Sequence, residues 1–466
     1  MQLLHKLFAP FDMTTGEPWK KIVLFTVPML LGNIAQQLYN TVDSIVVGNY
    51  VGDNALAAVG SAGPILNLLI VLYVGISVGA GIMVSQYFGA KNREGLSYTI
   101  GNSILLTLIA TVFIAVAGVF VTRPLLELLN TPESIIDWCA SYLYILFIGG
   151  AGLAFYNILS GVLRGLGDSV SALIYLVVAC VLNIGLDLLF VIYFNMGVSG
   201  VALATAIAQA VSAALCAVRL YRMNDMFDFK LNFMKWNKEY AMNVIRLGVP
   251  SGVTQAIFSM SMIVVQSLTN SFGEMFIAAN VIVMRVDGFA MMPNFSFGAA
   301  MTTYAGQNVG AGAYDRVKTG AKQGTLLAVG VSTVVTGAIL LVGKHLMGVF
   351  TETEELVILS MNLMRILAVG YIVMGVMQSL SGVMRGAGDT VTPMWISIIN
   401  TVVIRMPLAY IMCYLSRTPE LPNGKQEYVM VSLLISWIIG TILTCIFYAR
   451  GKWRAKAIHT EAGQAA

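Results

Sequence analysis

The sequence predicts an all-α polytopic membrane protein, with twelve transmembrane helices arranged as two six-helix bundles. Hydrophobic residues make up 58% of the 466 positions and charged residues only 11%, whereas about a quarter of a soluble domain is charged. Apolar runs of about 20 residues, the length that crosses a bilayer, recur along the chain. A ten-residue phrase also occurs twice, which indicates that one six-helix unit has been duplicated.

The duplication is clearest in two glycine-rich segments. Residues 160–169 read SGVLRGLGDS and residues 381–390 read SGVMRGAGDT, so position 381 repeats position 160 after 221 residues, and seven of the ten positions are identical. The same offset places Gln86 on Gln307. Because six spans per copy is an even number, both copies enter the membrane facing the same way. A pseudo-two-fold axis along the membrane normal must then relate them.

The predicted organisation is an N-terminal lobe at 1–222, a cytoplasmic linker at 223–240 and a C-terminal lobe with a short basic tail at 241–466. The linker mixes Lys, Asp and aromatic residues at irregular spacing. It is therefore expected either to lie at the lipid surface as an amphipathic segment or to be a solvated tether. The predicted spans are 21–48, 56–82, 97–121, 138–162, 170–193, 197–220, 241–270, 276–302, 321–343, 357–384, 391–415 and 428–449.

The positive charges fix the expected orientation. If the N-terminus lies inside, only Arg123, Lys344, Arg417 and Lys425 fall outside and three arginines fall within spans. The remaining 20 of the 27 Lys and Arg are then cytoplasmic. The positive-inside rule favours this arrangement. We therefore expect a multi-pass protein of the cell membrane with both termini in the cytoplasm.

The glycine-rich phrase lies at the cytoplasmic ends of spans four and ten. It lacks the Gly-Lys-Ser/Thr ending of a phosphate loop. It predicts instead a tight interhelical turn in which Asp168 and Asp389 cap the helices that follow. Pro28 interrupts the first span and Pro250 opens the seventh. A proline inside a spanning helix produces either a hinge or a fixed kink.

Several classes of function are excluded by composition. The five cysteines are scattered without CxxC spacing, and the three histidines all lie outside the spans. Neither a disulfide framework nor a metal cluster is indicated, and no nucleophile-and-base arrangement is present for an intramembrane enzyme. We expect no enzymatic activity, no cofactor and no nucleic-acid partner.

Six ionisable side chains fall within the predicted spans, where each charge costs at least about 2.5–3.5 kcal/mol. Four of them belong to the second copy. Asp287 there is expected to form a structural ion pair with Arg365 or Arg405, because Arg285 is only two positions away and points to another face of its helix. The six residues are Asp43, Asp187, Arg285, Asp287, Arg365 and Arg405.

The first copy holds Asp43 and Asp187 with no Lys or Arg inside a span. Asn183 lies one helical turn from Asp187 on the same face, and Thr205 reaches a similar depth from the opposite direction. These oxygens predict a site for a small cation. Na⁺ is one candidate. A proton is the other, because burial and a like charge both favour a neutral carboxyl group. Alternatively, the two acids only hydrogen-bond each other or a helix terminus.

Four segments together resemble the multidrug and toxin extrusion (MATE) transporters: PMLLGNIAQQLYNTVDSIVVG, SQYFGAKN, NIGLDLLF and the duplicated GVxRGxGD. The resemblance implies an antiporter of the MATE fold that exchanges sodium or protons for amphipathic, often cationic, drugs by alternating access. The cation site of bacterial and archaeal members matches Asp43, Asn183, Asp187 and Thr205. The acids of the NorM-like second-lobe site are replaced by Ser259 or Met260 and by Met374, so the chain is expected to be closer to the branch with the first-lobe site.

The resemblance also implies a substrate cavity between the lobes. Methionine suits a surface that repacks around different ligands. Besides amphipathic compounds and a monovalent cation, the expected partner is membrane lipid, and the protein is expected to be a monomer. The alternative is a flippase for lipid-linked precursors, which the three arginines of the second copy would suit. Fewer spans than such flippases usually have, and the acidic first lobe, favour export. The expected cavity residues are Tyr39, Asn40, Gln255, Met260, Met291 and Gln378.

Overall fold

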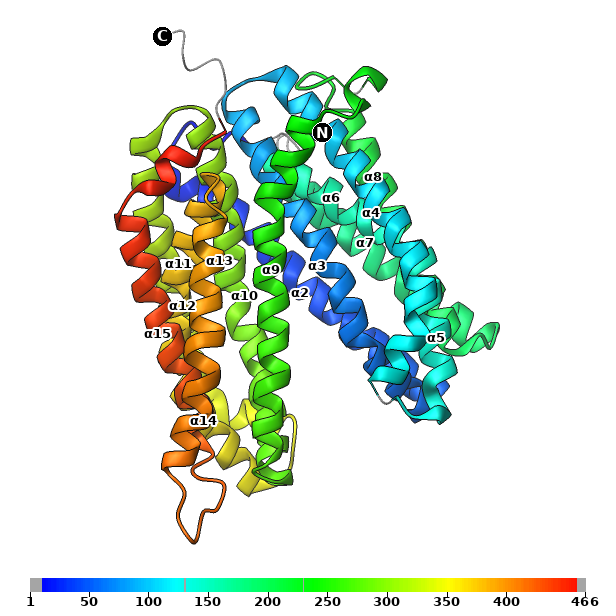
Figure 1. Cartoon of the computed structure of the whole chain (residues 1–466), viewed down its shortest axis with the longest axis vertical. Helices are drawn as coiled ribbons and strands as arrows, with labels where there is room; N and C mark the ends of the chain where they lie inside the picture. Colours follow the sequence, from blue (N-terminus) through cyan, green and yellow to red (C-terminus); the bar gives the residue numbers. More distant parts are fainter. Residues whose placement is uncertain (1–10, 130, 229, 459–466) are drawn as a thin grey trace. The chain divides into compact units, whose positions relative to one another are not determined.

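The computed structural model describes residues 11–129, 131–228 and 230–458. These residues form helices and connecting turns, with no strand beyond an isolated bridge between Thr418 and Leu421. The predicted all-α class is confirmed. The chain divides into two compact units (Figure 1). The first unit comprises residues 11–12 and the described part of Val27–Gly252, and the second comprises Met13–Thr26 and the described part of Val253–His459.

The first unit is built from helices that follow one another along the chain. Two five-residue π-helical turns extend α2 and α7, and a short 3₁₀ turn, η3 (Leu231–Met234), precedes α9. Its elements are α2 (Pro18–Val46) from Val27 onward, η1 (Val47–Val51), α3 (Asp53–Gly89), α4 (Arg93–Leu128), α5 (Glu133–Ile148), α6 (Ala151–Gly165), α7 (Ser169–Leu188), η2 (Leu189–Tyr193), α8 (Gly197–Tyr221) and the start of α9 (Lys238–Asn270).

The second unit begins with the first turns of α2 and continues from the middle of α9. A seven-residue π-helical segment, η4, interrupts the eleventh predicted span of the chain, 391–415. Its further elements are α10 (Glu274–Gly310), α11 (Tyr314–Gly348), α12 (Glu354–Gly386), α13 (Val391–Ile398), η4 (Ile399–Arg405), α14 (Met406–Leu415), α15 (Glu427–Ala449) and η5 (Lys452–Lys456).

Among the described residues, 11 helices are long and apolar enough to cross a membrane, and the number is 12 if one bent pair counts as a span. That pair is α5 and α6, bent by 50°, where the sequence predicts one straight span at 138–162. The break falls at Gly149 and Gly150. Glycine is a poor helix former, and a side chain at Gly149 would collide with Ala206. The predicted spans are thus present, and the fourth is bent.

The two units do not coincide with the two copies of the repeat. α2 passes from the second unit to the first between Thr26 and Val27, next to Pro28, and α9 passes from the first to the second after Gly252, close to Pro250. The start of α9 belongs with the first unit because Gly248 approaches the backbone of α3 at Gly75. Such close contact between helices requires small residues. The boundary between the two compact units therefore lies inside α9, whereas the boundary between the two copies of the repeat lies at the linker.

The start of α2 is held in the second unit in a similar way. The backbone N–H of Met13 donates to Gln307 Oε1 at 2.9 Å, and the N–H of Trp19 donates to Gln323 Oε1 at 3.0 Å. Arg316 donates to the carbonyl oxygen of Thr15 at 2.9 Å. These bonds attach the segment that precedes α2, and the first turn of α2 itself, to α10 and α11.

The duplicated glycine-rich phrase forms the predicted turn in both copies. Gly167 and Gly388 have φ of 87° and 95°, a region that glycine enters readily. Asp168 Oδ1 then accepts a hydrogen bond from the Ser171 N–H at 2.9 Å, and Asp389 Oδ1 accepts one from the Thr392 N–H at 3.2 Å. The predicted capping role of both aspartates is confirmed.

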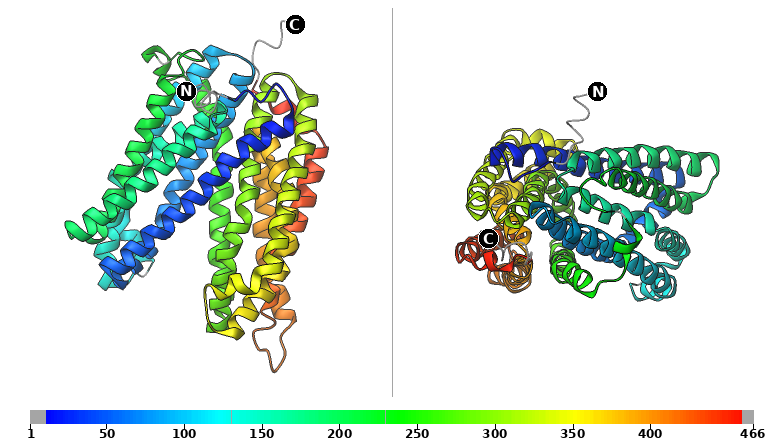
Figure 2. Two further views of the ribbon diagram at one scale, coloured as in Figure 1. Left: turned by 180° about the vertical axis from the view of Figure 1, so that it is seen from behind. Right: turned by 90° about the horizontal axis from the view of Figure 1, so that it is seen from above.

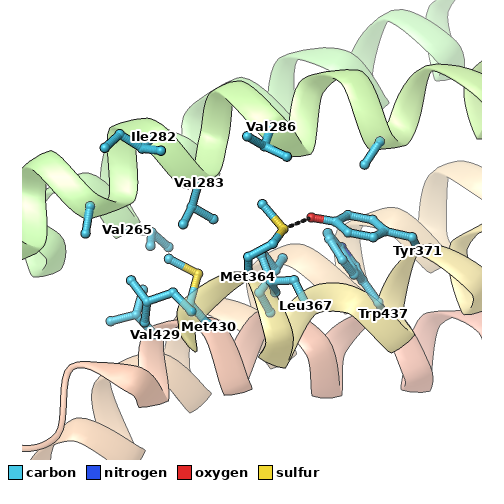
Figure 3. Close-up of a cluster of buried hydrophobic side chains, with 14 of the residues drawn as sticks. Val265, Ile282, Val283, Val286, Met364, Leu367, Tyr371, Val429, Met430 and Trp437 are labelled. Atoms are coloured by element: carbon cyan, nitrogen blue, oxygen red, sulfur yellow. Dashed lines mark hydrogen bonds between the residues drawn. The ribbon is translucent and has the colours of Figure 1, made fainter. Parts of the chain in front are cut away.

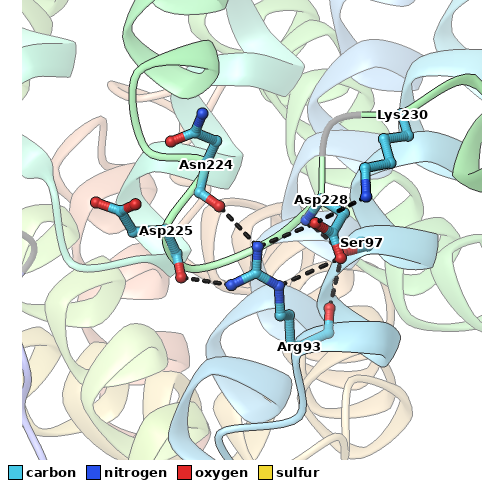
Figure 4. A network of polar contacts seen from close by, with 6 residues as sticks. All are labelled: Arg93, Ser97, Asn224, Asp225, Asp228 and Lys230. Carbon is cyan, nitrogen blue, oxygen red and sulfur yellow. Dashed lines mark hydrogen bonds and ion pairs between the residues drawn. The ribbon is translucent and has the colours of Figure 1, made fainter.

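The linker is bonded to the first turn of α4 (Figure 4). The Arg93 guanidinium pairs with Asp228 at 3.0 Å and donates to the carbonyl oxygens of Asn224 and Asp225 at 2.8 and 2.6 Å. The Asp228 N–H donates to Ser97 Oγ at 2.8 Å. The hydrogen bond from Arg93 lowers the pKa of the Asp228 carboxyl. This part of the linker is therefore attached to α4 by hydrogen bonds and an ion pair.

Further along the linker, the contacts become aromatic. Tyr98 of α4 meets the Phe233 ring edge-on, with centroids 4.9 Å apart, and stacks on Tyr240 at 5.2 Å. The Asn237 N–H donates to Asn102 Oδ1 at 2.8 Å. The chain is thus fixed to α4 over several turns before it enters α9.

Each unit has its own hydrophobic cluster. The cluster in the second unit joins α10, α12 and α15 (Figure 3), and in it the Tyr371 hydroxyl donates to Met364 Sδ at 3.0 Å. The cluster in the first unit includes Val46, Tyr142, Val191 and Val201. Val46 and Val201 lie on α2 and α8, two of the helices that carry the predicted cation site.

Candidate cation site

Three helices of the first unit bring the four predicted cation-site residues together. Asp43 lies in the last turn of α2, and Asp187 is the penultimate residue of α7. Each acid is followed within a few residues by a π-helical turn, η1 or η2. Such turns are frequent at functional sites. Asn183 lies one turn before Asp187, and Thr205 comes from α8.

Hydrogen bonds connect Asn183 to both neighbouring helix segments. In the amide orientation that gives each end a partner, its nitrogen donates to Asp187 Oδ2 at 2.9 Å and its oxygen accepts from the Thr205 N–H at 3.1 Å. In the opposite orientation the Asn183 nitrogen has only a 3.3 Å contact to Thr205 Oγ1, and the Asn183 oxygen faces another acceptor, Asp187 Oδ2. The first orientation is physically favourable. Asn183 and Asp187 are 1% and 0% exposed.

The two carboxyl groups face each other. Asp43 and Asp187 lie within hydrogen-bonding reach of one another. Yet Oδ1 of each is enclosed and finds no hydrogen-bond partner among the described residues. Neither acid forms an ion pair within the described part of the chain. Buried polar atoms are nearly always satisfied in folded proteins, so these oxygens are available to a bound ion or proton.

Two tyrosines complete the surroundings. The Tyr39 hydroxyl lies 3.2 Å from Thr205 Oγ1, which attaches the predicted cavity residue to the cation site. Tyr142 of α5 is buried close to both aspartates, and sequence reasoning missed it. A tyrosine in an apolar span gives no distinguishing signal, and only the three-dimensional placement of α5 shows its proximity.

The chemistry of the donor set suits a small monovalent cation. Its ligands are carboxylate, amide and hydroxyl oxygens, which are the atoms that hard cations prefer. Within the described ranges, no group of three or more His, Cys, Asp or Glu is placed to hold a metal ion. Two adjacent acids in a low-dielectric interior are costly when both are charged, and one proton or one Na⁺ would offset that cost.

The second unit holds its acid in a different environment. Asp287 on α10 lies within hydrogen-bonding reach of the Tyr371 hydroxyl and near Arg405, at the end of η4. Arg405 is 8% exposed. Asp287 and Arg405 form no ion pair in the described structure. Arg285 and Arg365 are both exposed, so Arg405 is the candidate partner that shares the interior with Asp287.

The predicted cavity residues lie in varied surroundings. Tyr39 is buried against Thr205, whereas its neighbour Asn40 is exposed. In the second unit, Gln255 and Met260 are exposed and Gln378 is half-buried. Met291 is enclosed in the hydrophobic cluster of that unit.

Long apolar helices, an internal duplication and a pair of acids inside one helical bundle define a membrane transporter. The MatE family model matches residues 28–189 and 250–411, once in each copy of the repeat. The chain belongs to the MatE family. It is a multi-pass membrane transporter and not an enzyme.

Similar proteins span almost the whole chain. The probable multidrug resistance protein YoeA of Bacillus subtilis is 31% identical, over 90% of this chain and 92% of its own. The probable multidrug resistance protein NorM of Thermotoga maritima is 25% identical, over 98% and 97%. A solved outward-facing conformation of a multidrug resistance MATE family transporter superposes with a TM-score of 0.88 at 25% identity, over 96% of this chain and 98% of that one.

Proposed function

We propose that the protein is a cation-coupled antiporter that exports amphipathic, cationic small molecules across the cell membrane by alternating access. The names of its relatives support multidrug export, and the outward-facing form of a similar transporter supports alternating access. One observation carries the coupling assignment. Asp43 and Asp187 face each other with an enclosed, unpartnered oxygen on each.

The coupling follows from charge. A charged side chain in the membrane interior costs at least about 2.5–3.5 kcal/mol, and no Lys or Arg of the described residues pairs with either acid. Binding one proton or one Na⁺ therefore stabilises the loaded site strongly. The exported compound is also cationic. Release of the ion makes the region more negative and therefore favours binding of the compound, whereas binding of the ion favours release of the compound. Such a coupling between two ligands acts in both directions.

Each polar residue has a part in this scheme. Asp43 and Asp187 hold the ion, Asn183 orients Asp187 through its 2.9 Å bond, and Thr205 supplies a further oxygen. If Na⁺ is the ion, these four side chains hold it. If a proton is the ion, the two carboxyl groups share it. Tyr39, bonded to Thr205 and adjacent to exposed Asn40, passes the state of the site to the surface of α2.

We further propose that the transporter is monomeric in the cell membrane, with both termini in the cytoplasm. The distribution of Lys and Arg supports this orientation. Asp287 and Arg405 are proposed to act structurally, as an internal charge pair of the second unit. Their proximity and their burial support that role.

The deciding experiment uses purified protein in lipid vesicles. A sodium gradient and a pH gradient are imposed separately, with a fluorescent cationic dye as cargo. We expect dye movement to be driven by one gradient and to run opposite to the ion. Dye movement that ignores both gradients would refute coupled antiport, and movement of a fluorescent lipid-linked precursor instead would establish the flippase alternative.

A further inference from the structure

The two units differ in how they treat the basic side chains at the end predicted to face the cytoplasm. In the first unit, three of these side chains are paired within the protein. Arg93 and Lys230 both pair with Asp228, at 3.0 and 3.7 Å, and Arg219 pairs with Asp168 at 2.9 Å. The other exposed basic side chains at this end of the first unit form no ion pair with a described residue and lie on separate segments. They are Lys91, Arg222, Lys235, Lys238 and Arg246.

At the corresponding end of the second unit, exposed positive charge is concentrated in one short segment and on the helices next to it. The segment from residue 450 to 456 reads RGKWRAK, with four basic residues and no acid. Lys318 pairs with Asp315 at 2.8 Å, but the other exposed basic side chains form no ion pair with any described residue. These seven side chains, named here the basic rim, are Lys20, Lys318, Lys322, Arg450, Lys452, Arg454 and Lys456.

The C-terminal part of the basic rim is held in a fixed conformation. Gly451, with φ of 70°, turns the chain back after α15. Trp453 is then 1% exposed, stacks on Tyr448 with ring centroids 5.5 Å apart and donates to the Tyr448 carbonyl at 3.0 Å. The Tyr314 hydroxyl donates to the Arg454 carbonyl at 3.4 Å. The aromatic ring is buried in the protein, and the basic side chains on either side point outward.

Three elements bring the rim together at one end of the second unit (Figure 2). The Tyr314 bond attaches η5 to the start of α11, and the Trp19 bond to Gln323 attaches the start of α2 to α11 as well. Lys318 and Lys322 are four residues apart and lie on one face of α11. The positive charges therefore form a surface that combines α2, α11 and η5.

Exposed aliphatic side chains continue from this surface on the same helix faces. Lys20 is followed one turn deeper by exposed Leu24, and Lys322 by exposed Leu326. On α15 the order is reversed because the helix runs the other way, with exposed Ile446 one turn before Arg450. A polyanion in solution would need only the charges. The pairing of charge with aliphatic surface suits a molecule that has an anionic head and an apolar chain.

We propose that the basic rim binds anionic phospholipids of the cytoplasmic leaflet. The ammonium and guanidinium groups receive the phosphate of the headgroup, and the acyl chains lie along Leu24, Leu326 and Ile446. Basic residues next to a membrane attract anionic lipid, and each contributes separately. The proposal is independent of which ion drives transport.

The test compares lipid-dependent stability in full-length purified protein. Phosphatidylglycerol or phosphatidylcholine is added to detergent-solubilised wild type, to a rim variant K452Q/R454Q/K456Q and to a matched variant R222Q/K235Q/K238Q, which removes the same charge from the first unit. Phosphatidylglycerol should raise Tm in the wild type and in the matched variant. In the rim variant its apparent affinity should fall on the order of 100-fold, since three charges are lost.

Two further measurements distinguish lipid binding at the rim from poor folding and from simple phosphate binding. A double variant K452Q/K456Q keeps Arg454 beside Tyr314 and serves if the triple variant folds poorly; it should lose part of the effect. Inorganic phosphate at the same concentration should not raise Tm. An unchanged phosphatidylglycerol response in the rim variants, an equal loss in the matched variant, or an equal response to inorganic phosphate would overturn the proposal.

Discussion

The acids of the two units meet opposite electrostatic conditions. In the first unit, Asp43 and Asp187 are neighbours of the same sign, and no Lys or Arg pairs with either in the described structure. In the second unit, Asp287 shares the interior with Arg405 and the Tyr371 hydroxyl. Asp287 therefore has a basic side chain nearby, although its Oδ1 is also enclosed without a partner among the described residues. We proposed above that the first unit instead takes its counter-charge from a bound ion, so that the two copies differ in their electrostatic roles.

The largest expected effect is on the unbalanced pair. Asp43→Asn and Asp187→Asn should each reduce gradient-driven export by at least about tenfold, equivalent to losing roughly 1.4 kcal/mol of coupling, because neither variant keeps two acids for one cation. Dye efflux from vesicles measures this. Ser44→Ala, a change at the exposed neighbour of Asp43, is the matched control and should transport normally. Full efflux in both Asn variants would refute the coupling role.

The next effect should appear in stability rather than in transport. Asp287→Asn leaves Arg405 buried without its counter-charge and should destabilise the protein by about 1–3 kcal/mol. Export per folded molecule should be retained. The double variant Asp287→Asn/Arg405→Met should recover part of the loss, since it removes both charges. Thermal unfolding and efflux are measured on the same samples. Unchanged Tm with abolished export would transfer the coupling role to the second unit.

A smaller effect is expected at the hydroxyl that connects the cation site to the exposed face of α2. Tyr39→Phe removes the 3.2 Å contact with Thr205, and one hydrogen bond contributes about 1 kcal/mol. The ion concentration for half-maximal efflux should therefore rise about fivefold, with little change in Tm. Thr205→Ser, which keeps the hydroxyl, should behave like the wild type. Equal ion dependence in wild type and Tyr39→Phe would show that this contact does not bear on ion binding.

The smallest effect concerns the ion pair between Arg93 and Asp228 that holds the linker to α4. Arg93→Gln removes the partner of Asp228 and should speed hydrogen exchange of the linker amides at neutral pH. Because Arg93 lowers the pKa of Asp228 in the folded protein, this stabilisation is complete above the unfolded pKa of about 3.9. It is lost as pH falls through the folded value. The difference between wild type and variant should therefore fade in acid. A difference that is constant with pH would exclude this ion pair as its cause.

The sequence was sufficient to predict the helical class, the repeat and the four polar side chains that meet in the first unit, for identifiable reasons. A charge in an apolar span is conspicuous, and the four-residue spacing of Asn183 and Asp187 places both on one face. Tyr142 carries no such signal. Its helix is also bent at Gly149 and Gly150, so its depth does not follow from counting along a straight span. Arg93 and Asp228 lie 135 positions apart, and their charges alone resemble an ordinary solvated surface.

The shared helices α2 and α9 have a consequence for biosynthesis. Residues 1–222 contain a complete repeat, yet Gly75 and Gly79 of α3 receive their neighbours only when α9 has been translated. The opening turns of α2 wait longer still, for Gln307 and Gln323. The first half of the nascent polypeptide can therefore reach its final structure only after the ribosome has synthesised part of the second half. A gene split at the linker would yield two fragments that must assemble to be stable, rather than two independent folding domains.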